Sequence, residues 1–469
     1  MQSFTIFKIV FKLAFFLATV VASAQNISGT WKGALNVQGT ELPLAFNITE
    51  SDGAYKATLD SPDQGAFGIP IDKTTFENNQ LTITQSQMGM EYTATFTDGV
   101  FKGTFKQSGR VFPLDLKKGE KEVKKEKKPK PQEPKKPYPY ASEEVSFENA
   151  KAGNIKLAGT LTLPENVKNP PVVILISGSG PQNRNEELLG HKPFLVLADH
   201  LTRNGIAVLR YDDRGTAKSE GDFGTATSFD FATDVEAAIA YLQTRKDVVD
   251  TNKIGLVGHS EGGLIAPIVA TNNTNVAFCV LLAGPGVDGK EVLLTQSKRA
   301  AELEGYPKVD IENSQEVSAK VFEISTNYKG ETSKEEIIKL FKELRTKMTF
   351  EKAKAELTDE AIVAQAEMIT SPWMQAFLGY DPQTSLQKVT CPVLAVNGEK
   401  DFQVLPELNL NAIEKGLKNS KDVTIKQFKD LNHLFQTSKT GALSEYATIE
   451  ETFAPVALEY ISNWINKRF

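Results

Sequence analysis

The sequence predicts a two-domain protein in which a small antiparallel β domain precedes a larger α/β domain with a mostly parallel sheet. Three observations lead to this fold class. The chain has 469 residues, more than one ordinary domain holds. Residues 27–118 consist of short alternating segments separated by turn signals. From residue 142 onward, apolar strand-like runs alternate with helical runs, which implies a parallel sheet covered on both faces.

The composition excludes some classes of protein. The chain is 40% hydrophobic and 24% charged, as soluble globular proteins are, and its net charge of −6 gives no reason to expect a nucleic-acid partner. The two cysteines, Cys279 and Cys391, are too few for a disulfide framework or a cysteine zinc site. Both lie in apolar strand-like runs, which favours buried free thiols. A bridge stays open if the two strands are neighbours.

The first 24 residues have the pattern of a signal peptide. Two lysines precede the apolar stretch LAFFLATVV, and ASA at 22–24 fits the small-residue cleavage rule. The apolar stretch is too short to span a bilayer, which needs about 20 residues, and no other segment is long and apolar enough to do so. We therefore expect Gln25 to be the mature N-terminus of a soluble protein that is exported to the periplasm or secreted.

Residues 27–118 are expected to form a small barrel or sandwich of about eight strands. In LPLAFNI (42–48) the apolar residues alternate with the period of two that is typical of a half-buried strand. This region resembles the lipocalin-like barrels that accompany exported bacterial hydrolases. A stabilising or attachment module is the preferred interpretation, because a fold alone does not supply a function.

Residues 119–141 are predicted to be a linker. They are rich in lysine, glutamate and proline and nearly lack aliphatic residues, so they cannot bury enough surface to fold. We expect an extended, solvated spacer, with contact between its basic tract and an acidic surface as the alternative.

A candidate nucleophile lies in KIGLVGHSEGG (253–263). An apolar strand ends there and an apolar helix begins, and residues 258–262 fit the motif G-x-S-x-G. A serine on such a sharp strand-to-helix turn holds its hydroxyl out of the backbone, ready to attack. The sequence therefore predicts Ser260 as the nucleophile.

The base is chosen among four histidines. His200 lies within a helical run, His191 lies before a helix and upstream of the serine, and His259 immediately precedes Ser260. His433 follows the last predicted strand on a loop, from which a side chain can reach the serine. Elimination favours His433 as the general base.

The acid is expected at the end of the preceding strand, VLAVNGEKDFQV (393–404). It offers Asp401 and, as second choice, Glu399. Asp430 is a rival, but it lies only three residues from His433 on the same strand exit. Asp401 preserves the chain order Ser, Asp, His, which differs from the orders of chymotrypsin-like and subtilisin-like proteases.

An oxyanion site needs two backbone N–H groups. One is expected from Glu261, which follows the nucleophile at a helix N-terminus. The other is expected from the loop ISGSGPQNRN, with Ser179 as first choice and Gly180 as the alternative. The small residues of this loop let the backbone approach a substrate carbonyl.

Residues 286–388 interrupt the alternation of strands and helices. They have helical spacing and no strand follows them for about 100 residues, so we expect a helical lid over the site. Trp373, Met374 and Phe377 in SPWMQAF are candidates to line the acyl pocket, or alternatively to form the lid's own core.

Residues 142–469 resemble the α/β-hydrolase superfamily, in particular bacterial serine esterases. The resemblance rests on SGSGPQNRN, LRYDDRGTAKSEGDF, GHSEGG, SPWMQAFLGYDP and VNGEKDFQV, together with the late His433. It implies an eight-stranded, mostly parallel sheet with helices on both faces, and a structural role for the RYDDRG turn. One departure is Ser177-Gly178, where many lipases have His-Gly.

These residues predict a serine hydrolase that cleaves small or medium acyl esters and needs no metal or cofactor. Two alternatives remain: a serine peptidase of the same fold, and a noncatalytic ligand-binding protein that acts through the β domain. Peptidases of this fold usually carry a large β-propeller, for which 27–118 is too short.

Overall fold

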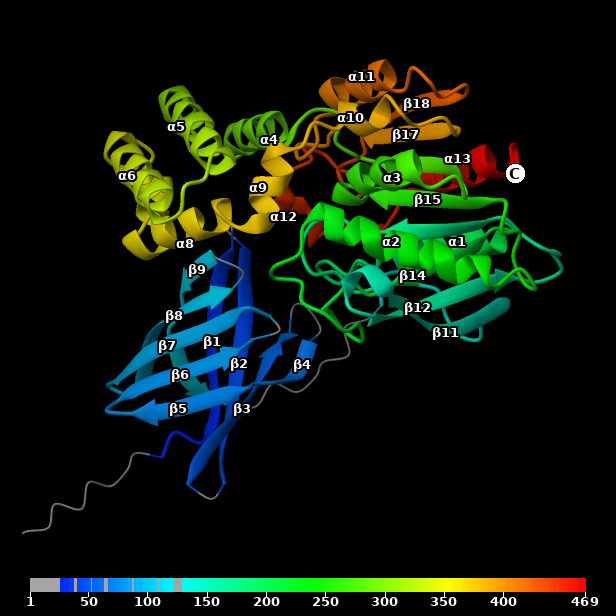
Figure 1. Ribbon diagram of the computed structural model, residues 1–469. Coiled ribbons are helices and arrows are strands. Elements are labelled where there is room, and N and C mark those ends of the chain that lie inside the picture. Colours follow the sequence, from blue (N-terminus) through cyan, green and yellow to red (C-terminus); the bar gives the residue numbers. More distant parts are fainter. Residues whose placement is uncertain are drawn as a thin grey trace, which may run out of the picture.

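The computed structural model describes residues 26–469, except 38–39, 52, 63–65, 87, 108–109 and 121–128. The predicted signal peptide, residues 1–24, and Gln25 lie outside the described residues. Figure 1 shows three parts of the chain: an antiparallel β domain in blue, a layered α/β domain in cyan to red, and a group of helices in green to yellow above the β domain.

The N-terminal domain is a single antiparallel sheet of ten strands in the described residues. The sheet order is β4-β3-β2-β1-β10-β8-β7-β6-β5, with β9 paired to β8. The edge strands β4 and β5 are consecutive in the chain. Between them Ile71 N donates to Ala57 O of β3 (3.3 Å) and Asp72 N donates to Thr84 O of β6 (3.1 Å), so the two ends of the sheet meet and it curls into a barrel. The strands are β1 (Gly29–Val37), β2 (Thr40–Ser51), β3 (Ala54–Ser61), β4 (Ala66–Pro70), β5 (Lys73–Glu77), β6 (Gln80–Gln85), β7 (Met90–Thr97), β8 (Val100–Gln107), β9 (Arg110–Pro113) and β10 (Leu116–Gly119).

The alternation predicted for LPLAFNI is confirmed in β2. Leu44, Phe46 and Ile48 of β2 are buried in one core, where Phe46 stacks on Tyr92 with ring centroids 5.3 Å apart. Short turns with positive φ join several strands, as at Asp98 (φ 52°) before Gly99. The number of strands is ten rather than the expected eight, because short strands at the edge and beside β8 extend the sheet.

The α/β domain contains an eight-stranded sheet in the order β11-β12-β14-β13-β15-β16-β17-β18. The first two strands are antiparallel and the strands from β14 onward are parallel to one another. The predicted, mostly parallel eight-stranded sheet is therefore confirmed. The strands are β11 (Tyr140–Asn149), β12 (Ile155–Pro164), β13 (Val172–Ile176), β14 (Ala207–Tyr211), β15 (Ile254–His259), β16 (Val276–Leu282), β17 (Val393–Gly398) and β18 (Val423–Phe428).

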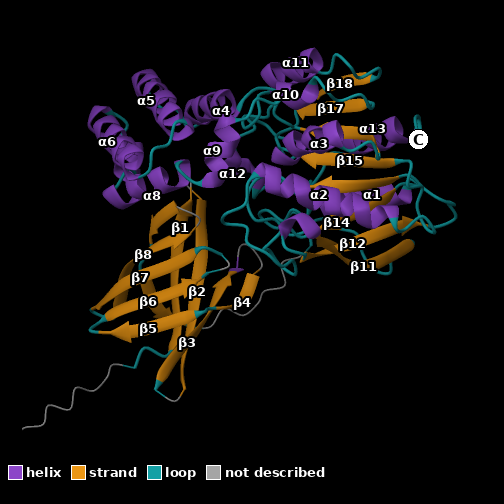
Figure 2. Cartoon of the chain, viewed as in Figure 1, coloured by secondary structure: helices purple, strands orange, loops and turns teal. Residues whose placement is uncertain are grey.

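Helices cover both faces of this sheet, as Figure 2 shows in purple over orange. One apolar layer packs β strands against α1 and α13, and the other packs them against α2, α3 and α11. Successive residues of a buried strand point to opposite layers, so strands such as VVILI at 172–176 are apolar throughout. These helices are α1 (Pro193–Arg203), α2 (Ser228–Gln243), α3 (Glu261–Asn272), α11 (Pro406–Gly416) and α13 (Pro455–Asn466), with a short helix α12 (Leu443–Tyr446) and a 3₁₀ turn η2 (Ala150–Ala152).

A group of helices stands between β16 and β17 and is called the lid below. It has an apolar core of its own, which includes Val321, Ile337, Ile362 and Met374. In Figure 1 it lies beside the sheet edge at which β15 and β17 end. Its helices are α4 (Gly289–Leu303), α5 (Lys308–Thr326), α6 (Glu331–Lys347), α7 (Glu351–Glu356), α8 (Asp359–Ile369) and α9 (Pro372–Gly379). The short helix α10 (Gln383–Leu386) follows and packs into the core of the α/β domain through Leu386.

The second half of the predicted linker is not a solvated spacer. The Gln132 side chain donates to Phe453 O (2.7 Å) and accepts from the backbone N–H groups of Thr452 (2.6 Å) and Phe453 (3.0 Å). Lys130 donates to Ile449 O (2.7 Å) and lies 3.6 Å from Glu450. Hydrogen bonds to backbone groups, among them those of the buried Thr452 and Phe453, dock this segment where apolar burial cannot. Part of the basic tract does meet an acidic residue, Glu450.

The β domain touches the lid. Lys106 of β8 forms an ion pair with Glu367 of α8 (2.9 Å), and Lys334 of α6 approaches the same carboxylate (3.3 Å). Figure 1 shows the end of the barrel beneath α8. Within the ranges that the structure describes, no helix has the length and apolar character needed to cross a membrane.

The two cysteines are free thiols: Cys279 lies on β16, and Cys391 lies two residues before the neighbouring strand β17. Cys279 is buried in β16, and its backbone N–H donates to Pro392 O, next to the half-buried Cys391 (3.0 Å).

Candidate active site

Ser260 occupies a strained turn between β15 and α3. Its backbone has φ 52° and ψ −116°, a conformation that residues other than glycine rarely adopt. The turn closes only because its neighbours are glycines: a Cβ on Gly258 would lie 2.0 Å from Gly262 O, and one on Gly262 would lie 2.1 Å from Ile176 O. The motif therefore lifts a half-buried serine out of the backbone at the carboxyl edge of the sheet.

His433 and Asp401 form a buried hydrogen-bonded pair. His433 Nδ1 lies 2.7 Å from Asp401 Oδ2, and the residues are 4% and 2% exposed. The other carboxylate oxygen accepts from the backbone N–H groups of Gln403 (2.8 Å) and Val404 (3.0 Å), which fixes the carboxylate in place. With Nδ1 turned to the carboxylate, Nε2 is the ring nitrogen left to exchange a proton with another group.

The loops that follow β17 and β18 are pressed together. A Cβ on Gly398 would lie 2.2 Å from Leu431 O, so only glycine permits the approach. The rings of His433 and His259 have centroids 4.8 Å apart, and His259 is the residue before Ser260. The three residues chosen from the sequence thus come from three strand ends at one edge of the sheet.

The rival acids are engaged elsewhere. Glu399 accepts a hydrogen bond from Asp430 N (3.1 Å), and Asp430 forms an ion pair with Lys400 (2.7 Å). The Asp430 side chain is 48% exposed. Asp401 is therefore the carboxylate that faces the His433 ring.

The two remaining histidines hold helices and loops together. His191 is buried between Thr452 Oγ1 (2.9 Å) and Tyr446 O (3.2 Å), and His200 of α1 bonds Ser462 Oγ of α13 (3.0 Å). Burial lowers the pKa of each ring.

The loop after β13 lies against the Ser260 turn. A Cβ added to Gly178 would lie 3.2 Å from Ser260 Cβ, so the two backbones nearly touch. The Gly178 N–H already donates to Glu186 Oε1 (2.8 Å), which leaves the N–H groups of the exposed Ser179 and of Gly180 (φ 94°) for other acceptors. The backbone N–H of Glu261 lies in the first turn of α3.

The Glu261 carboxyl is buried beside the turn, and no lysine, arginine or histidine of the described ranges forms an ion pair with it. It is 4% exposed and accepts from Ser228 Oγ (2.5 Å) and from Trp373 Nε1 of the lid (2.8 Å). Burial raises its pKa, and these hydrogen bonds lower it only in part. Nearby Asp213 accepts from Ser177 Oγ (2.6 Å), and burial places its pKa well above the usual range.

The predicted pocket residues divide between two environments. Met374 is buried within the lid's core. Trp373 and Phe377 stack with ring centroids 5.4 Å apart, and Phe377 packs against Leu264 of α3 and Val404. The pair therefore lies where the lid meets the α/β domain.

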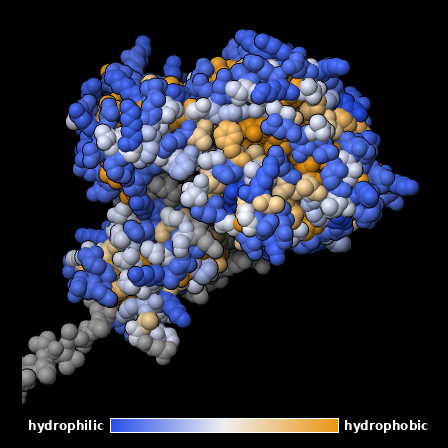
Figure 3. Space-filling view, viewed as in Figure 1, coloured by the Kyte–Doolittle hydropathy of each residue, from blue (hydrophilic) through white to orange (hydrophobic). Residues whose placement is uncertain are grey.

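Two further aromatic residues extend this junction. Phe229 of α2 is 45% exposed, and its ring meets Tyr380 edge to face at 5.3 Å. Figure 3 shows apolar residues gathered on this face of the α/β domain, while the outer surface of the lid is mostly hydrophilic. Sequence reasoning missed these two rings, since nothing in their local pattern distinguishes them from ordinary helix residues.

Sequence reasoning also missed Glu186 and the contacts of His259. His259 Nδ1 lies 2.8 Å from Glu186 Oε1, and Nε2 lies 3.0 Å from His433 O. Glu186 sits in an irregular loop with no periodic pattern, so no local signal identifies it. In the described part of the chain, no three His, Cys, Asp or Glu side chains are grouped so as to hold a metal ion.

The parallel sheet, the glycine-lined serine turn and the His–Asp pair define an α/β-hydrolase. The chain belongs to the Hydrolase_4 family, described as "Serine aminopeptidase, S33", whose model matches residues 192–438, more than half of the chain.

Among curated proteins, the chain is similar to esterase EstD of Thermotoga maritima, with 26% identity over 289 residues. That alignment covers 62% of this chain and 60% of EstD, so the chain spans less than two thirds of the length of that relative. An uncharacterised 31.7 kDa protein of Escherichia coli is 27% identical over 259 residues, which cover 54% of this chain and 79% of that protein.

Solved structures with a similar course of the chain include two esterases. That of Pyrococcus furiosus has 16% identity and a TM-score of 0.45, and covers 70% of this chain and 92% of its own. That of Thermogutta terrifontis has 18% identity and a TM-score of 0.38, and covers 69% and 98%.

Proposed function

We propose that the protein is a serine hydrolase that cleaves carboxylic esters of small or medium acyl groups through an acyl-enzyme. The observation that carries the proposal is the buried bond of 2.7 Å between His433 Nδ1 and Asp401 Oδ2, at the same edge of the sheet as a serine on a strained turn. The similarity to EstD supports an ester rather than an amide as the substrate.

In the proposed mechanism His433 Nε2 takes the proton of Ser260 as its hydroxyl attacks the acyl carbonyl. Asp401 holds the imidazole in the required tautomer and stabilises its protonated form. The N–H groups of Glu261 and Ser179 donate to the oxyanion of the tetrahedral intermediate, with Gly180 as the alternative second donor. His433 then protonates the leaving alcohol, and a water molecule activated in the same way releases the acid.

The lid supplies the proposed acyl pocket. Trp373 and Phe377 form an apolar wall at the junction of the lid and the α/β domain. Apolar walls of this kind favour hydrocarbon acyl groups over polar ones. Met374 contributes by holding α9 in the lid core.

The decisive experiment is hydrolysis of a p-nitrophenyl acyl series by the wild type and by Ser260→Ala. We expect Ser260→Ala to lower kcat by about 10⁶-fold. Ser462→Ala, at the hydroxyl that bonds His200 far from the site, is the matched control and should keep its activity. Equal activity of Ser260→Ala and the wild type would contradict the mechanism.

A serine-directed fluorophosphonate probe separates an enzyme from a binding protein. Labelling of the wild type that is lost in Ser260→Ala supports a serine hydrolase, whereas an unlabelled wild type supports a ligand-binding role for the β domain. Comparing an acyl ester with the matching peptide amide then separates an esterase from a peptidase.

We further propose that the protein acts outside the cytoplasm. The support is the basic and apolar N-terminal pattern ending in ASA at 22–24. Cell fractionation with N-terminal sequencing tests it: a mature chain that begins at Gln25 is expected outside the cytoplasm, and an uncleaved cytoplasmic chain would contradict it.

A further inference from the structure

Glu186 and His259 form a buried pair that the mechanism above does not use. Glu186 is 5% exposed and His259 is 6% exposed. The pair joins the loop before α1 to the last residue of β15, through the contact of 2.8 Å between Oε1 and Nδ1.

The partners of His259 determine where its protons are. Nε2 faces His433 O, a carbonyl oxygen that can only accept, so Nε2 carries a hydrogen. Nδ1 faces Glu186 Oε1, the oxygen that already accepts the Gly178 N–H. A ring that donates from both nitrogens is an imidazolium, and the carboxylate of Glu186 is its counter-ion.

The electrostatic surroundings agree with a charged ring. Burial alone would lower the pKa of His259, but the charge and hydrogen bond of Glu186, the carbonyl of His433 and the charge of Asp401 together raise it. The charged and titratable groups that act on the ring are therefore Glu186, Asp401 and His433, and the charge of Glu186 in turn acts on Asp213.

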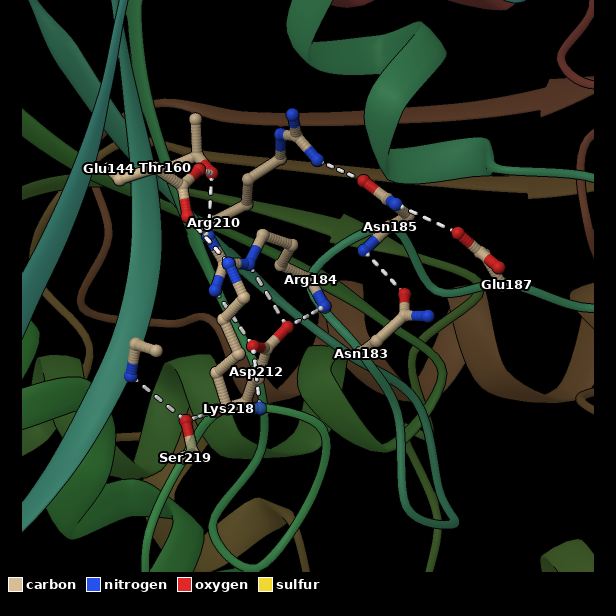
Figure 4. Close-up of polar contacts among 11 residues, drawn as sticks. Glu144, Thr160, Asn183, Arg184, Asn185, Glu187, Arg210, Asp212, Lys218 and Ser219 are labelled. Atoms are coloured by element: carbon tan, nitrogen blue, oxygen red, sulfur yellow. Dashed lines mark hydrogen bonds and ion pairs between the residues drawn. The ribbon is translucent and has the colours of Figure 1, made fainter. Parts of the chain in front are cut away.

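Glu186 is held in place by its chain neighbours. Arg184 forms a bidentate pair with Asp212, with Nε to Oδ1 at 3.0 Å and Nη2 to Oδ2 at 2.8 Å. Arg210 donates to Asn185, whose amide in turn donates to Glu187 (2.9 Å). Figure 4 shows the contacts of Arg184, Asn185 and Glu187, the residues that precede and follow position 186 in the chain. These neighbours hold the backbone of Glu186 at φ 52°, and its carboxylate is held by the Gly178 N–H (2.8 Å) and by His259 Nδ1 (2.8 Å).

The pair links the three segments that the proposed mechanism needs. Glu186 holds the Gly178 amide at the start of the oxyanion loop, His259 directly precedes Ser260, and its Nε2 holds the backbone of His433. We propose that Glu186 and His259 are a charged positioning pair that sets the distance between the nucleophile turn, the oxyanion loop and the catalytic histidine. This inference rests on the proposed function and deepens it.

Loss of the proton from His259 removes one of its two hydrogen bonds. A neutral ring can donate to either Glu186 or His433 but not to both, so one of the three segments is released. The protonated pair should therefore set an alkaline limit to kcat. Replacing Glu186 by glutamine removes the counter-ion and moves that limit to lower pH.

The kinetic test compares Glu186→Gln, Glu186→Asp and His259→Gln with the wild type across pH. We expect Glu186→Gln and His259→Gln to lower kcat by about 10²-fold with KM nearly unchanged, because they displace reacting groups rather than remove binding contacts. Glu186→Asp keeps the negative charge, so its alkaline limit should lie closer to that of the wild type than the limit of Glu186→Gln does. His200→Gln, a histidine in the α1–α13 contact, is the matched control.

A second measurement does not depend on hydrolysis. With four histidines, ¹⁵N-histidine NMR of the folded Ser260→Ala protein can follow each ring, and His259→Gln assigns its signal. We expect both nitrogens of His259 to be protonated at neutral pH, and one to lose its proton when Glu186→Gln is added.

The two measurements separate the two claims. A neutral His259 in the Ser260→Ala protein, or an alkaline limit that Glu186→Gln leaves in place, would overturn the positioning pair even in an active esterase. A doubly protonated His259 in a protein without esterase activity would support the charged pair and contradict the proposed function instead.

Discussion

Asp401 and Asp430 are both aspartates near His433, but only one of them faces its ring. Asp401 is 2% exposed and bonds His433, whereas Asp430 pairs with Lys400 at the surface. An asparagine at 401 would keep the shape of the side chain but favour the wrong tautomer of the ring.

We therefore predict that Asp401→Asn lowers kcat by about 10⁴-fold. Asp430→Asn, as the control, should retain activity and leave stability nearly unchanged, because it removes only a solvent-exposed ion pair with Lys400. Steady-state kinetics on a p-nitrophenyl ester measures both, and a larger loss for Asp430→Asn would reverse the assignment.

Glu261 gives the protein a pH dependence of stability. Its pKa is raised by burial, so the folded state keeps a proton that the unfolded chain releases near its usual pKa of about 4.3. Stability is then lost as pH rises from that value to the folded-state pKa, by about 1.4 kcal/mol for every pH unit across the window.

We predict that Glu261→Gln becomes more stable relative to the wild type as pH rises from 4 to 8. Glutamine can still accept from Ser228 and Trp373 but never ionises. Urea unfolding at several pH values measures the difference, with the exposed Glu148→Gln as control. A stability gap that stays constant across this range would contradict the prediction.

At the scale of single elements, α9 and α3 are joined by a hydrogen bond in addition to their apolar contact. Trp373 Nε1 donates to Glu261 Oε1 across the junction of the lid and the α/β domain (2.8 Å). The bond connects the lid directly to the residue after the proposed nucleophile, so movement of α9 is coupled to that turn.

We predict that Trp373→Phe costs about 1–3 kcal/mol of unfolding free energy, since it leaves a buried carboxyl short of one donor. Hydrogen exchange in α9 should rise at the same time. Trp464→Phe, which removes a bond to Thr424 Oγ1 (2.9 Å), is the control and should leave α9 unchanged. Unaltered exchange in α9 of the Trp373 variant would show that the bond does not hold the lid.

At the scale of the whole molecule, the segment between the domains is fastened rather than free. Gln132 makes three hydrogen bonds with the backbone of Thr452 and Phe453. The ion pair of Lys106 and Glu367 is half-exposed and adds little, at most about 1 kcal/mol. The amide of Gln132 is thus the firmer of the two attachments.

We predict that Gln132→Ala costs about 1–3 kcal/mol, because two buried N–H groups lose their acceptor, and that proteases cut the segment around it faster. Lys135→Ala, at an exposed neighbouring position, is the control. Limited proteolysis and urea unfolding check both parts, and cleavage rates equal to the wild type would restore the picture of a solvated spacer.

The fold class could be predicted because its signals are local. Alternating apolar residues around Phe46 indicate a two-sided strand, and the unbroken apolar run at 172–176 indicates a strand buried on both faces. The glycines around Ser260 indicate the sharp turn, which is also a local signal because a Cβ at those positions would clash with the adjacent backbone. The docking of Gln132 could not be predicted, because its partners lie 320 residues further along the chain.

Some residues of the candidate site could be predicted from local sequence and others could not. Ser260, Asp401 and His433 are identifiable because each follows a strand, and their catalytic roles stay predictions. Glu186 is not identifiable, since its significance comes only from the Gly178 amide and the His259 ring that surround it.

The sequence by itself determined the parallel sheet with helices on both faces, the succession of short strands and turns in the β domain, and the serine on its glycine turn. These features follow from apolar periodicity and from steric limits, both of which act between residues that are near neighbours in the chain. Only the tertiary structure decided which carboxylate faces His433, which histidine is held by Glu186, and how the lid is fastened to Glu261. Those choices depend on distances between side chains far apart in the chain, which no local pattern encodes.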